Sequence, residues 1–478
     1  MMQPEQQFAP FQARMQAESL PQAFIDTFRY YYTQLVAGDT GLIPEADLEP
    51  VSNLPDAEQL SPDLAQVGEA HLGQTVFIKL NGGLGTSMGL QKAKALLPVK
   101  GELTFLDIIA RHTLHHNIPL VLMNSFNTRA DSLAYLARYP QLGQTLPLDF
   151  VQHKAPKILQ ATLQPAEWPA NRALEWAPPG HGDIYTALAT SGMLEKLLDR
   201  GYIYAFISNA DNLGAALNTT ILGHFIETGA PFMMEVADRT PADRKGGHLA
   251  RRKADGQLIL RESAQCPQED RAAFQDIARH RYFNTNSLWL HLPSLQQVLD
   301  ARDGILGLPM IRNSKTLNPR DPASPAVYQI ETAMGSAIAI FAGARALRVP
   351  RARFSPVKTT NDLLAVRSDA FILTEDYRVV LHPQRQGKAM VCDLDPYQYK
   401  FIDQLDANFP AGPPSLLNCD KFTVRGQVVF TVPLMLTGEI EIMNDDDDPY
   451  IFDAEQAELL FGHHHHHGIS LDIDHHDV

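Results

Sequence analysis

The sequence predicts an α/β protein, because short apolar runs alternate with helical patterns along much of its length. Three of these runs, residues 76–78, 119–123 and 202–207, end in polar or glycine-rich residues that precede helical or turn patterns. Alternation of this kind favours a sheet with helices on its faces. Ligands of open α/β sheets bind outside the carboxyl ends of the strands, so we expect these polar ends to converge on one site.

The composition fits a large acidic protein with more than one domain. The chain has 478 residues, 45% of them hydrophobic, and a formal net charge of −15 from 40 basic and 55 acidic side chains. This charge argues against a nucleic-acid-binding surface over the whole protein. The longest apolar run, residues 334–344, is too short to cross a bilayer, and residues 1–11 lack a signal pattern. The distant cysteines Cys266, Cys392 and Cys419 fit a reducing compartment, so we expect a cytoplasmic protein with no membrane partner.

A glycine-rich stretch follows the first apolar run and carries the strongest ligand signal. Four glycines lie between Gly82 and Gly89, and glycine lets backbone amides approach an anion closely. A Walker loop is excluded because Leu90 and Gln91 follow Gly89, and a dinucleotide fingerprint because Met88 stands where it needs glycine. The pattern favours a phosphate-binding loop; the alternative is a turn that serves only the fold.

Apolar periodicity predicts the other elements in order. Residues 12–36 carry the apolar face of an amphipathic helix, and residues 38–73 are an acidic, proline-rich lead-in to the main domain. We expect helices at 106–115, 131–139, 334–344 and 362–366, and a helix with apolar positions from 184 to 198 that Asp183 caps. Further strands are expected at 150–151, 232–237 and 287–290, and a hairpin at 257–262.

Beyond about residue 392 the pattern changes to short strands. Apolar residues fall on alternate positions from Phe422 to Leu436, interrupted by Gly426 and Pro433, which indicates strands and turns of a small separate β unit. Acidic residues 445–448, five histidines at 463–467 and further aspartates and histidines follow. Such a tail could bind transition metals, although a solvated disordered segment is the simpler interpretation.

Asp211 is the strongest isolated candidate for a metal ligand. It follows a strand-like run and lies in the polar segment from Asn209 to Asn212. Carboxylates suit Mg²⁺, which usually takes one or two of them together with phosphate oxygens. A strand-end turn is the alternative, because Asn and Asp favour turns.

Three lysines and one histidine lie beside polar or glycine-rich segments. Lys94, Lys245 and Lys358 supply compact positive charges that can neutralise phosphate oxygens, although most lysines are only solvated. His181 lies between two glycines and can donate a hydrogen bond to a ligand; a loop histidine without a partner is the alternative. The sequence shows neither a Ser-His-Asp spacing nor a paired-carboxylate motif.

Seven short motifs occur in an order that resembles a known enzyme family. They are LNGGLGTSMG (80–89), PGHGDIY (179–185), NADNLG (209–214), KGG (245–247), NTN (284–286), ETA (331–333) and RFSPVK (353–358). They span about residues 75–370 and resemble the eukaryotic-type UTP–glucose-1-phosphate uridylyltransferases, also called UDP-glucose pyrophosphorylases. One glycine loop is weak evidence, whereas ordered matches along the chain are strong.

The resemblance implies a Rossmann-like nucleotidyltransferase domain with a mixed central sheet and a small C-terminal β domain similar to a left-handed β-helix. The implied division is an N-terminal helical segment (1–70), the catalytic domain (71–391) and the C-terminal domain with its acidic, histidine-rich tail (392–478). The implied reaction converts UTP and glucose 1-phosphate to UDP-glucose and pyrophosphate, with Mg²⁺ as cofactor.

The resemblance also implies a role for each matching residue. Nucleotide binding would fall to Leu80, Asn81, Gly82, Gly83, Gln152 and Gly180, with Gln152 at the uracil edge. The substrate sugar phosphate would contact His181, Asn209, Lys245, Asn284, Asn286 and Glu331. Asp211 would bind the metal, and Lys94 and Lys358 would act on the phosphates. The family commonly has Gly-Pro before the lysine that matches Lys94, whereas Lys92 and Ala93 precede it here, so Lys92 is an alternative phosphate contact.

Other functions stay open at this point. A pyrophosphorylase for UDP-N-acetylhexosamine or for several UDP-sugars belongs to the same class, but Asn81 and residues 84–87 favour glucose. A nicotinamide-dependent dehydrogenase needs an acidic residue about 20 positions beyond the glycines. Asp107 lies near that distance, but the fingerprint itself is missing. A non-catalytic nucleotide-binding module would release no pyrophosphate from UTP. The sequence predicts no oligomeric state.

Overall fold

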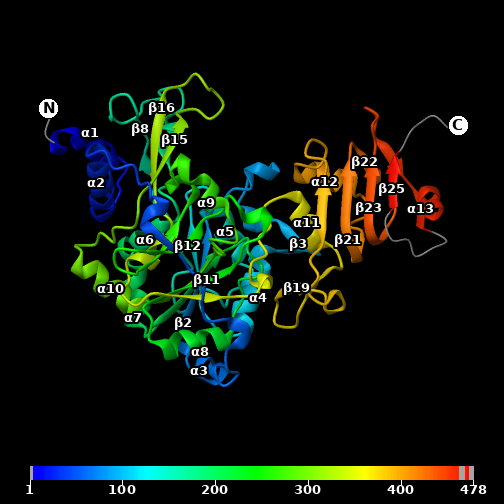
Figure 1. Ribbon diagram of the computed structural model, residues 1–478, viewed down its shortest axis with the longest axis horizontal. Coiled ribbons are helices and arrows are strands. Elements are labelled where there is room, and N and C mark those ends of the chain that lie inside the picture. The colour runs from blue at the N-terminus through cyan, green and yellow to red at the C-terminus, as the bar shows by residue number, and fades with distance from the viewer. Residues whose placement is uncertain (1–3, 462–468, 473–478) are drawn as a thin grey trace.

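A ten-stranded mixed sheet lies at the centre of the structure, a computed structural model that describes residues 4–461 and 469–472 (Figure 1). Its main path is β1 (Leu48–Pro50), β12 (His248–Arg252), β14 (Tyr282–His291), β10 (Tyr204–Asn209), β2 (Thr75–Asn81), β5 (Leu120–Asn124) and β6 (Asp149–Val151). Three strands branch from this path: β11 (Phe232–Asp238), β13 (Leu258–Arg261) and β17 (Arg345–Arg348). The strands from β10 to β6 are parallel, whereas β14 is antiparallel to β10. The expected α/β fold with a mixed central sheet is confirmed.

Alternate residues of the central strands pack on opposite faces of this sheet. Phe77 and Phe206 belong to the core on one face, whereas Val76, Ile78 and Ile207 belong to the core on the other. Side chains alternate across a strand, so a run that is apolar at every position is buried on both sides. Helices α4 (Phe105–His115) and α8 (Thr219–Thr228) contribute to the first core, and α6 (Ile184–Thr190), α7 (Met193–Asp199) and α10 (Leu292–Ala301) to the second.

Two N-terminal helices, α1 (Pro4–Ala17) and α2 (Gln22–Val36), replace the single helix expected over residues 12–36. Pro21 precedes α2, where its fixed φ suits a helix start but not the interior of a longer helix. The apolar face expected on α2 is confirmed, because Phe24, Phe28 and Leu35 are buried.

The lead-in between these helices and β2 is part of the main body. Its strand β1 pairs with β12, and its helix α3 (Leu64–Ala70) packs on α8. A Cβ added to Gly68 would lie 1.9 Å from the Thr219 carbonyl oxygen, so glycine permits this close helix contact.

Residues 334–344 do not form the expected buried α-helix. A 3-10 helix, Met334–Ala339, takes its place, and its residues up to Ile338 are buried. A Cβ added to Gly335 would lie 2.6 Å from Asn284 Nδ2, so this segment fits as a tight turn against the sheet. The small and apolar residues of this segment predicted that it is buried but not that its backbone is a 3-10 helix.

Asp183 precedes α6 but does not cap it with its side chain. Its carboxylate accepts hydrogen bonds from the backbone N–H of His153 (2.8 Å) and pairs with His153 Nδ1 (2.9 Å). The expected helix also breaks in two at Gly192, whose φ of 74° lies in the left-handed region.

The other expected helices and the hairpin are confirmed within a few residues. They are α4, α5 (Arg129–Leu136), α11 (Thr360–Arg367) and the antiparallel pair of β12 with β13. The remaining strands outside the C-terminal unit are β3 (Pro98–Lys100), β4 (Leu103–Thr104), β7 (Ala155–Pro156), β8 (Ile158–Leu159), β9 (Trp176–Ala177), β15 (Ile311–Thr316), β16 (Ala326–Glu331), β18 (Phe371–Leu373) and β19 (Val379–Leu381), and the remaining helix is α9 (Arg271–Gln275). No helix in the described part of the chain is long and apolar enough to cross a bilayer.

The C-terminal unit consists of parallel strands at one end of the molecule, drawn in orange and red in Figure 1. One sheet contains β20 (Val391–Leu394), β21 (Ser415–Arg425), β23 (Met435–Met443) and β25 (Ile469–Asp472), and a second contains β22 (Val428–Phe430) and β24 (Tyr450–Phe452). Helices α12 (Ile402–Asn408) and α13 (Ala454–Phe461) accompany them. Phe422 and Phe430 belong to the same continuous hydrophobic core as Leu363 of α11. The histidines at 463–467 lie outside the described residues.

Candidate active site

The glycine-rich loop begins after Asn81, the last residue of β2, and its later residues contact its first ones. The backbone N–H of Lys94 donates to the Gly83 carbonyl (3.1 Å), and Leu84 forms a β-bridge with Ala93. These backbone contacts hold Lys94 beside the carboxyl end of β2, although it lies more than ten residues further along the chain.

Two glycines of this loop suit its geometry, Gly82 by its side-chain neighbour and Gly89 by its backbone conformation. A Cβ added to Gly82 would lie 2.9 Å from Gln152 Oε1, so glycine allows the predicted uracil-binding side chain to approach the loop. Gly89 has a φ of 80°, which side chains other than glycine rarely adopt. Ser125 Oγ donates to the Gly82 carbonyl (2.9 Å) and fixes the start of the loop.

Asn81 is buried, and its side chain ties two strands together. Its amide Nδ2 donates to Asn124 Oδ1 and to Ser132 Oγ, both at 2.8 Å. The Asn81 side chain therefore joins the end of β2 to the end of β5 and to α5.

A cleft enclosing about 880 Å³, part of it open to solvent, lies where β2 and β10 end. Its lining includes every predicted nucleotide-binding residue (Leu80, Asn81, Gly82, Gly83, Gln152 and Gly180) and also Lys94, His181, Asn209 and Asp211. Ala95, Met123, Pro178 and Ala210 complete it. The polar ends of these strands therefore converge, as expected for a ligand site in an α/β sheet.

Lys94 and Asp211 form an ion pair across the cleft. Lys94 Nζ lies 2.6 Å from Asp211 Oδ2, and the two side chains are 16% and 26% exposed. Lys92, the alternative phosphate contact, is exposed and does not line the cleft. A partly exposed pair of this kind contributes little to stability, so it can exchange partners when an anion or a cation enters.

His181 presents a neutral imidazole to the cleft. Its Nδ1 accepts a hydrogen bond from the backbone N–H of Met334 (2.9 Å), so the ring proton is on Nε2. Burial lowers the pKa of His181 to about 4. Gly180 beside it has a φ of 79°, and a Cβ there would lie 2.3 Å from the Thr332 carbonyl oxygen. The loop thus holds an uncharged N–H donor at a fixed place.

The model of the family "UTP–glucose-1-phosphate uridylyltransferase" matches residues 23–436. The chain belongs to this family. It is therefore an enzyme, a nucleotidyltransferase. It is 38% identical over 384 residues to the probable UTP–glucose-1-phosphate uridylyltransferase of Schizosaccharomyces pombe, covering 79% of this chain and 74% of the relative. The Saccharomyces cerevisiae UTP–glucose-1-phosphate uridylyltransferase is also 38% identical, with 79% and 75% covered.

Solved structures of UDP-glucose pyrophosphorylases share the mixed α/β fold over most of the chain. A variant of the Leishmania major enzyme superposes with a TM-score of 0.88 at 44% identity, covering 93% of this chain and 96% of that one. The Trypanosoma brucei protein, described as a UDP-glucose phosphorylase, gives a TM-score of 0.82 at 43% identity, with 94% and 97% covered. The dehydrogenase interpretation is therefore not favoured.

Two predicted sugar contacts, Asn284 and Asn286 of β14, do not line the cleft but lie near its Asn209 end. β14 is antiparallel to β10, with Ile207 opposite Leu288, so Asn284 and Asn286 lie at the sheet edge where Asn209 ends β10. Asn284 Nδ2 donates to Asn286 Oδ1 (2.8 Å), and Asn286 has a φ of 57°. The β11–β14 register shifts here, and such a bulge redirects side chains at the end of a strand.

Lys245 lies in an exposed loop before β12 and does not line the cleft. The pairing of His248 with Phe283 places Gly247 level with Asn284, which brings this loop to the same edge. Glu262, a residue that no motif indicated, lies beneath it: a Cβ on Gly247 would be 2.6 Å from Glu262 Oε2. Burial raises the pKa of the Glu262 carboxyl.

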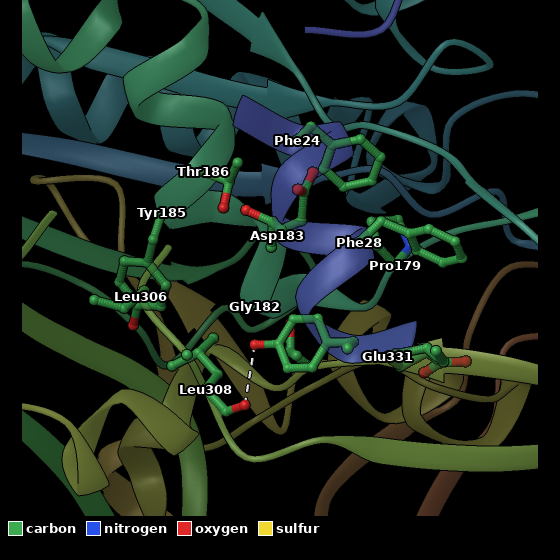
Figure 2. Close-up of a pocket in the computed structure, with 15 residues that line it drawn as sticks. Phe24, Phe28, Pro179, Gly182, Asp183, Tyr185, Thr186, Leu306, Leu308 and Glu331 are labelled. Carbon is green, nitrogen blue, oxygen red and sulfur yellow. Dashed lines mark hydrogen bonds between the residues drawn. The ribbon is translucent and has the colours of Figure 1, made fainter. Parts of the chain in front are cut away.

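Glu331 lies outside the cleft, at the edge of a second pocket beneath α2 (Figure 2). It ends β16, opposite Ile311 of β15, and its Cβ is 3.1 Å from where a Cβ on Gly180 would stand. Figure 2 shows Phe24, Phe28 and Leu308 around this pocket, with the hydrogen bond of the Tyr31 hydroxyl to the Leu308 carbonyl drawn as a dashed line (3.0 Å). The role of Glu331 as a sugar contact remains a prediction.

Lys358 follows a segment that is bound directly to the Asp211 loop. The Val357 N–H donates to the Asp211 carbonyl (3.1 Å), and Pro356 forms a β-bridge with Asn212. The Lys358 side chain is exposed, with Nζ 5.7 Å from the centre of the Phe354 ring. It does not line the cleft, although its segment contacts the Asp211 loop, which does.

A separate group of possible metal ligands in the described part of the chain comprises His112, His116 and Asp376. Both ring nitrogens of His112 are engaged, with the Asp376 carbonyl (2.7 Å) and the Leu217 N–H (3.1 Å). Arg378 Nε also donates to the Asp376 carboxylate (2.7 Å). These contacts give the group a structural role between α4 and the β18–β19 hairpin.

Proposed function

We propose that this cleft joins UTP and glucose 1-phosphate to give UDP-glucose and pyrophosphate, the reaction named by the chain's family. The observation that carries the proposal is the grouping of the glycine loop, Lys94, Asp211 and the His181 N–H in one cleft. A Leishmania major relative, 45% identical with a TM-score of 0.85, has been solved in complex with UDP-glucose, which supports this substrate class.

The reaction is an in-line displacement at phosphorus. An oxygen of glucose 1-phosphate forms a bond to the α-phosphorus of UTP, and the bond from that phosphorus to the bridging oxygen breaks. The electron pair leaves with pyrophosphate. Because the attacking oxygen already belongs to an anion, no protein base is needed, and catalysis depends on positioning and charge neutralisation. Lys94 in the cleft and Lys358, on the segment that contacts the Asp211 loop, supply the positive charge.

Mg²⁺ is the proposed cofactor, and Asp211 its protein ligand. Asp211 offers one partly exposed carboxylate oxygen at the strand end, which suits an ion that takes most of its ligands from water and substrate phosphates. When bound, the ion would offset negative charge on the phosphates. Lys94, now 2.6 Å from this carboxylate, is then free to contact the α-phosphate.

His181 is proposed as a hydrogen-bond donor to a phosphate oxygen of the sugar substrate. A half-buried neutral imidazole with its proton on Nε2 donates without adding a charge. The Met334 N–H keeps this tautomer in place, so the donor needs no reorganisation during the reaction.

The sugar is proposed to lie against Asn209, Asn284 and Asn286, with Lys245 and Glu262 at the far side. Amides and a carboxylate at the end of a strand match the alternating donors and acceptors of hexose hydroxyls. Glucose is favoured over an N-acetylhexosamine or a broad set of sugars by the family match and by the named relatives.

We further propose that the C-terminal unit is a left-handed β-helix and that the enzyme works in the cytoplasm. Stacked parallel pairs, β20–β21–β23–β25 and β22–β24, support the first point. Three free cysteines in the described structure, two of them buried, support a reducing compartment.

The test is pyrophosphate release from UTP. Release that depends on glucose 1-phosphate and Mg²⁺ is expected. The kcat/KM for glucose 1-phosphate should exceed the values for galactose 1-phosphate and N-acetylglucosamine 1-phosphate. Release without any sugar phosphate, or a preference for the N-acetylated sugar, would contradict the proposal.

A further inference from the structure

The Asp211 loop and the segment that carries Lys358 are joined by one buried side chain, Asn212. Asn212 is 4% exposed, and its side chain does not reach the cleft. Its Oδ1 accepts from the backbone N–H of Ser355 (2.9 Å) and of Gly214 (3.1 Å), and its Nδ2 donates to the Arg353 carbonyl (3.2 Å). One amide thus satisfies backbone groups on both segments.

Other contacts hold the outer parts of the same two segments. Arg353 is fixed by a buried bidentate pair with Glu235 (2.7 and 2.8 Å) and donates to the Ala216 carbonyl (3.2 Å). Lys79 donates to the Ala215 carbonyl (2.8 Å). The carbonyls of Ala215 and Ala216 that accept these bonds follow Gly214 in the chain, whereas Asn212 is the direct neighbour of Asp211.

We propose that Asn212 is a positioning residue for uridylyl transfer, which sets Lys358 relative to the metal-binding carboxylate of Asp211. Asn212 follows Asp211 directly, and Ser355 lies three residues before Lys358, with Val357 between them bonded to the Asp211 carbonyl. Without the amide, the Lys358 segment keeps its backbone contacts with the Asp211 loop through Val357 and Pro356 but loses the two side-chain hydrogen bonds that brace it at Arg353 and Ser355. A displacement of about 1 Å in a charged group can cost about 100-fold in rate.

This inference rests on the proposed roles of Asp211 and Lys358, and the test separates the two. Asn212→Ala is expected to lower kcat about 10- to 100-fold, with a smaller change in the KM for UTP, because the glycine loop is intact. Asn218→Ala is the matched control: Asn218 caps α8 in the same loop by accepting from the Ile221 N–H (2.9 Å). It should lower Tm while leaving kcat unchanged, which shows what loss of a structural amide does here.

The double variant decides whether Asn212 acts through Lys358. In a Lys358→Ala background, Asn212→Ala should lower kcat little further, because the charge it positions is already gone. Equal effects in the two backgrounds, or an unchanged kcat in the single variant while Lys358→Ala is slow, would overturn the inference. If Lys358→Ala and Asp211→Asn themselves turn over normally, the proposed roles of those residues fail instead.

Asn212→Asp provides a second variant if the alanine form folds poorly. It keeps an acceptor for the Ser355 N–H but places an oxygen about 3.2 Å from the Arg353 carbonyl, where the amide donated. The same loss of kcat is expected, again absent from the Lys358→Ala background. A full kcat would show that the donor to Arg353 is not needed and would overturn the positioning role.

Discussion

The cleft and the pocket beneath α2 share one loop but differ in chemistry. Pro178, Gly180 and His181 face the cleft, whereas Pro179, Gly182 and Asp183 line the pocket (Figure 2). The pocket is walled mainly by apolar side chains of α2 and residues 306–308. The cleft is open and holds glycines, a lysine and a carboxylate.

This contrast shows that the more apolar pocket is not the one that groups the candidate catalytic residues. A pocket lined mainly by apolar side chains suits packing of α2 against the body. A triphosphate carries several negative charges that must stay solvated or be neutralised, so it needs an open site with cations and backbone N–H groups. Changes in the cleft should therefore alter kcat, whereas changes in the pocket should alter stability.

The largest effect is expected for Lys94→Ala. Loss of a group that neutralises charge at the reacting phosphate should lower kcat about 100- to 1,000-fold, with little loss of stability because the ion pair with Asp211 is partly exposed. Lys92→Ala, in the same loop but exposed, is the control and should retain full kcat. Steady-state pyrophosphate release measures kcat for both variants. Equal losses of kcat would contradict the assignment of the phosphate contact to Lys94 rather than Lys92.

Asp211→Asn should mainly change the dependence on Mg²⁺. Without its carboxylate, the Mg²⁺ concentration for half-maximal rate should rise at least about tenfold, since even outer-shell changes cost 10- to 100-fold in metal affinity. Rates measured across a Mg²⁺ titration test this. An unshifted midpoint with a lowered maximal rate would assign Asp211 to charge balance with Lys94 alone.

His181 lies in the loop shared by the two regions, and it should affect how the free energy of unfolding depends on pH. Its pKa in the folded chain is about 4, below the usual value near 6.5. Between these values the unfolded chain binds a proton that the folded chain excludes, so stability falls as the pH falls through this window. In His181→Gln the slope of the unfolding free energy against pH should be shallower by up to about 1.4 kcal/mol per pH unit, because one proton is involved. Urea titrations between pH 4.5 and 7 measure it, and identical slopes would show that His181 is not the buried titrating group.

The smallest effect is expected in the pocket, for Tyr31→Phe. This variant removes the hydroxyl that donates to the Leu308 carbonyl (3.0 Å) and should lower the free energy of unfolding by about 1 kcal/mol. The kcat should not change, because the ring still fills the space. A fall in kcat without a fall in stability would mean that the pocket communicates with the cleft through residues 179–183.

Much of the cleft could be predicted because its parts are local in the sequence. The glycine loop, the Asn-Ala-Asp-Asn segment and the Gly-His-Gly loop are each contiguous, and each lies at a strand end or before a helix, where ligand sites occur. The choice between Lys92 and Lys94 needed the structure, because the Lys94 N–H bond to Gly83 decides which lysine faces inward. Glu331 has the right residue type, but its place on β16 puts it at the other pocket.

Two residues near the site received no role from the sequence. Glu262 follows a hairpin strand and belongs to no motif, whereas Asn212 lies inside the NADNLG motif but only as a neighbour of Asp211. Local sequence does not show which distant groups their side chains contact. Their positions follow from contacts with Gly247 and with Ser355, which are far away in sequence.

The sequence by itself determined the α/β class, the buried strands and the chemistry at their ends, because apolar runs, glycines and polar turn residues act over a few neighbouring positions. Only the tertiary structure decided which of these ends meet. The tautomer of His181 depends on Met334, 153 residues away, and the Lys358 segment is joined to the Asn212 side chain by a hydrogen bond that spans 143 residues. Such contacts form only when the sheet and its two cores pack, so local patterns cannot specify them.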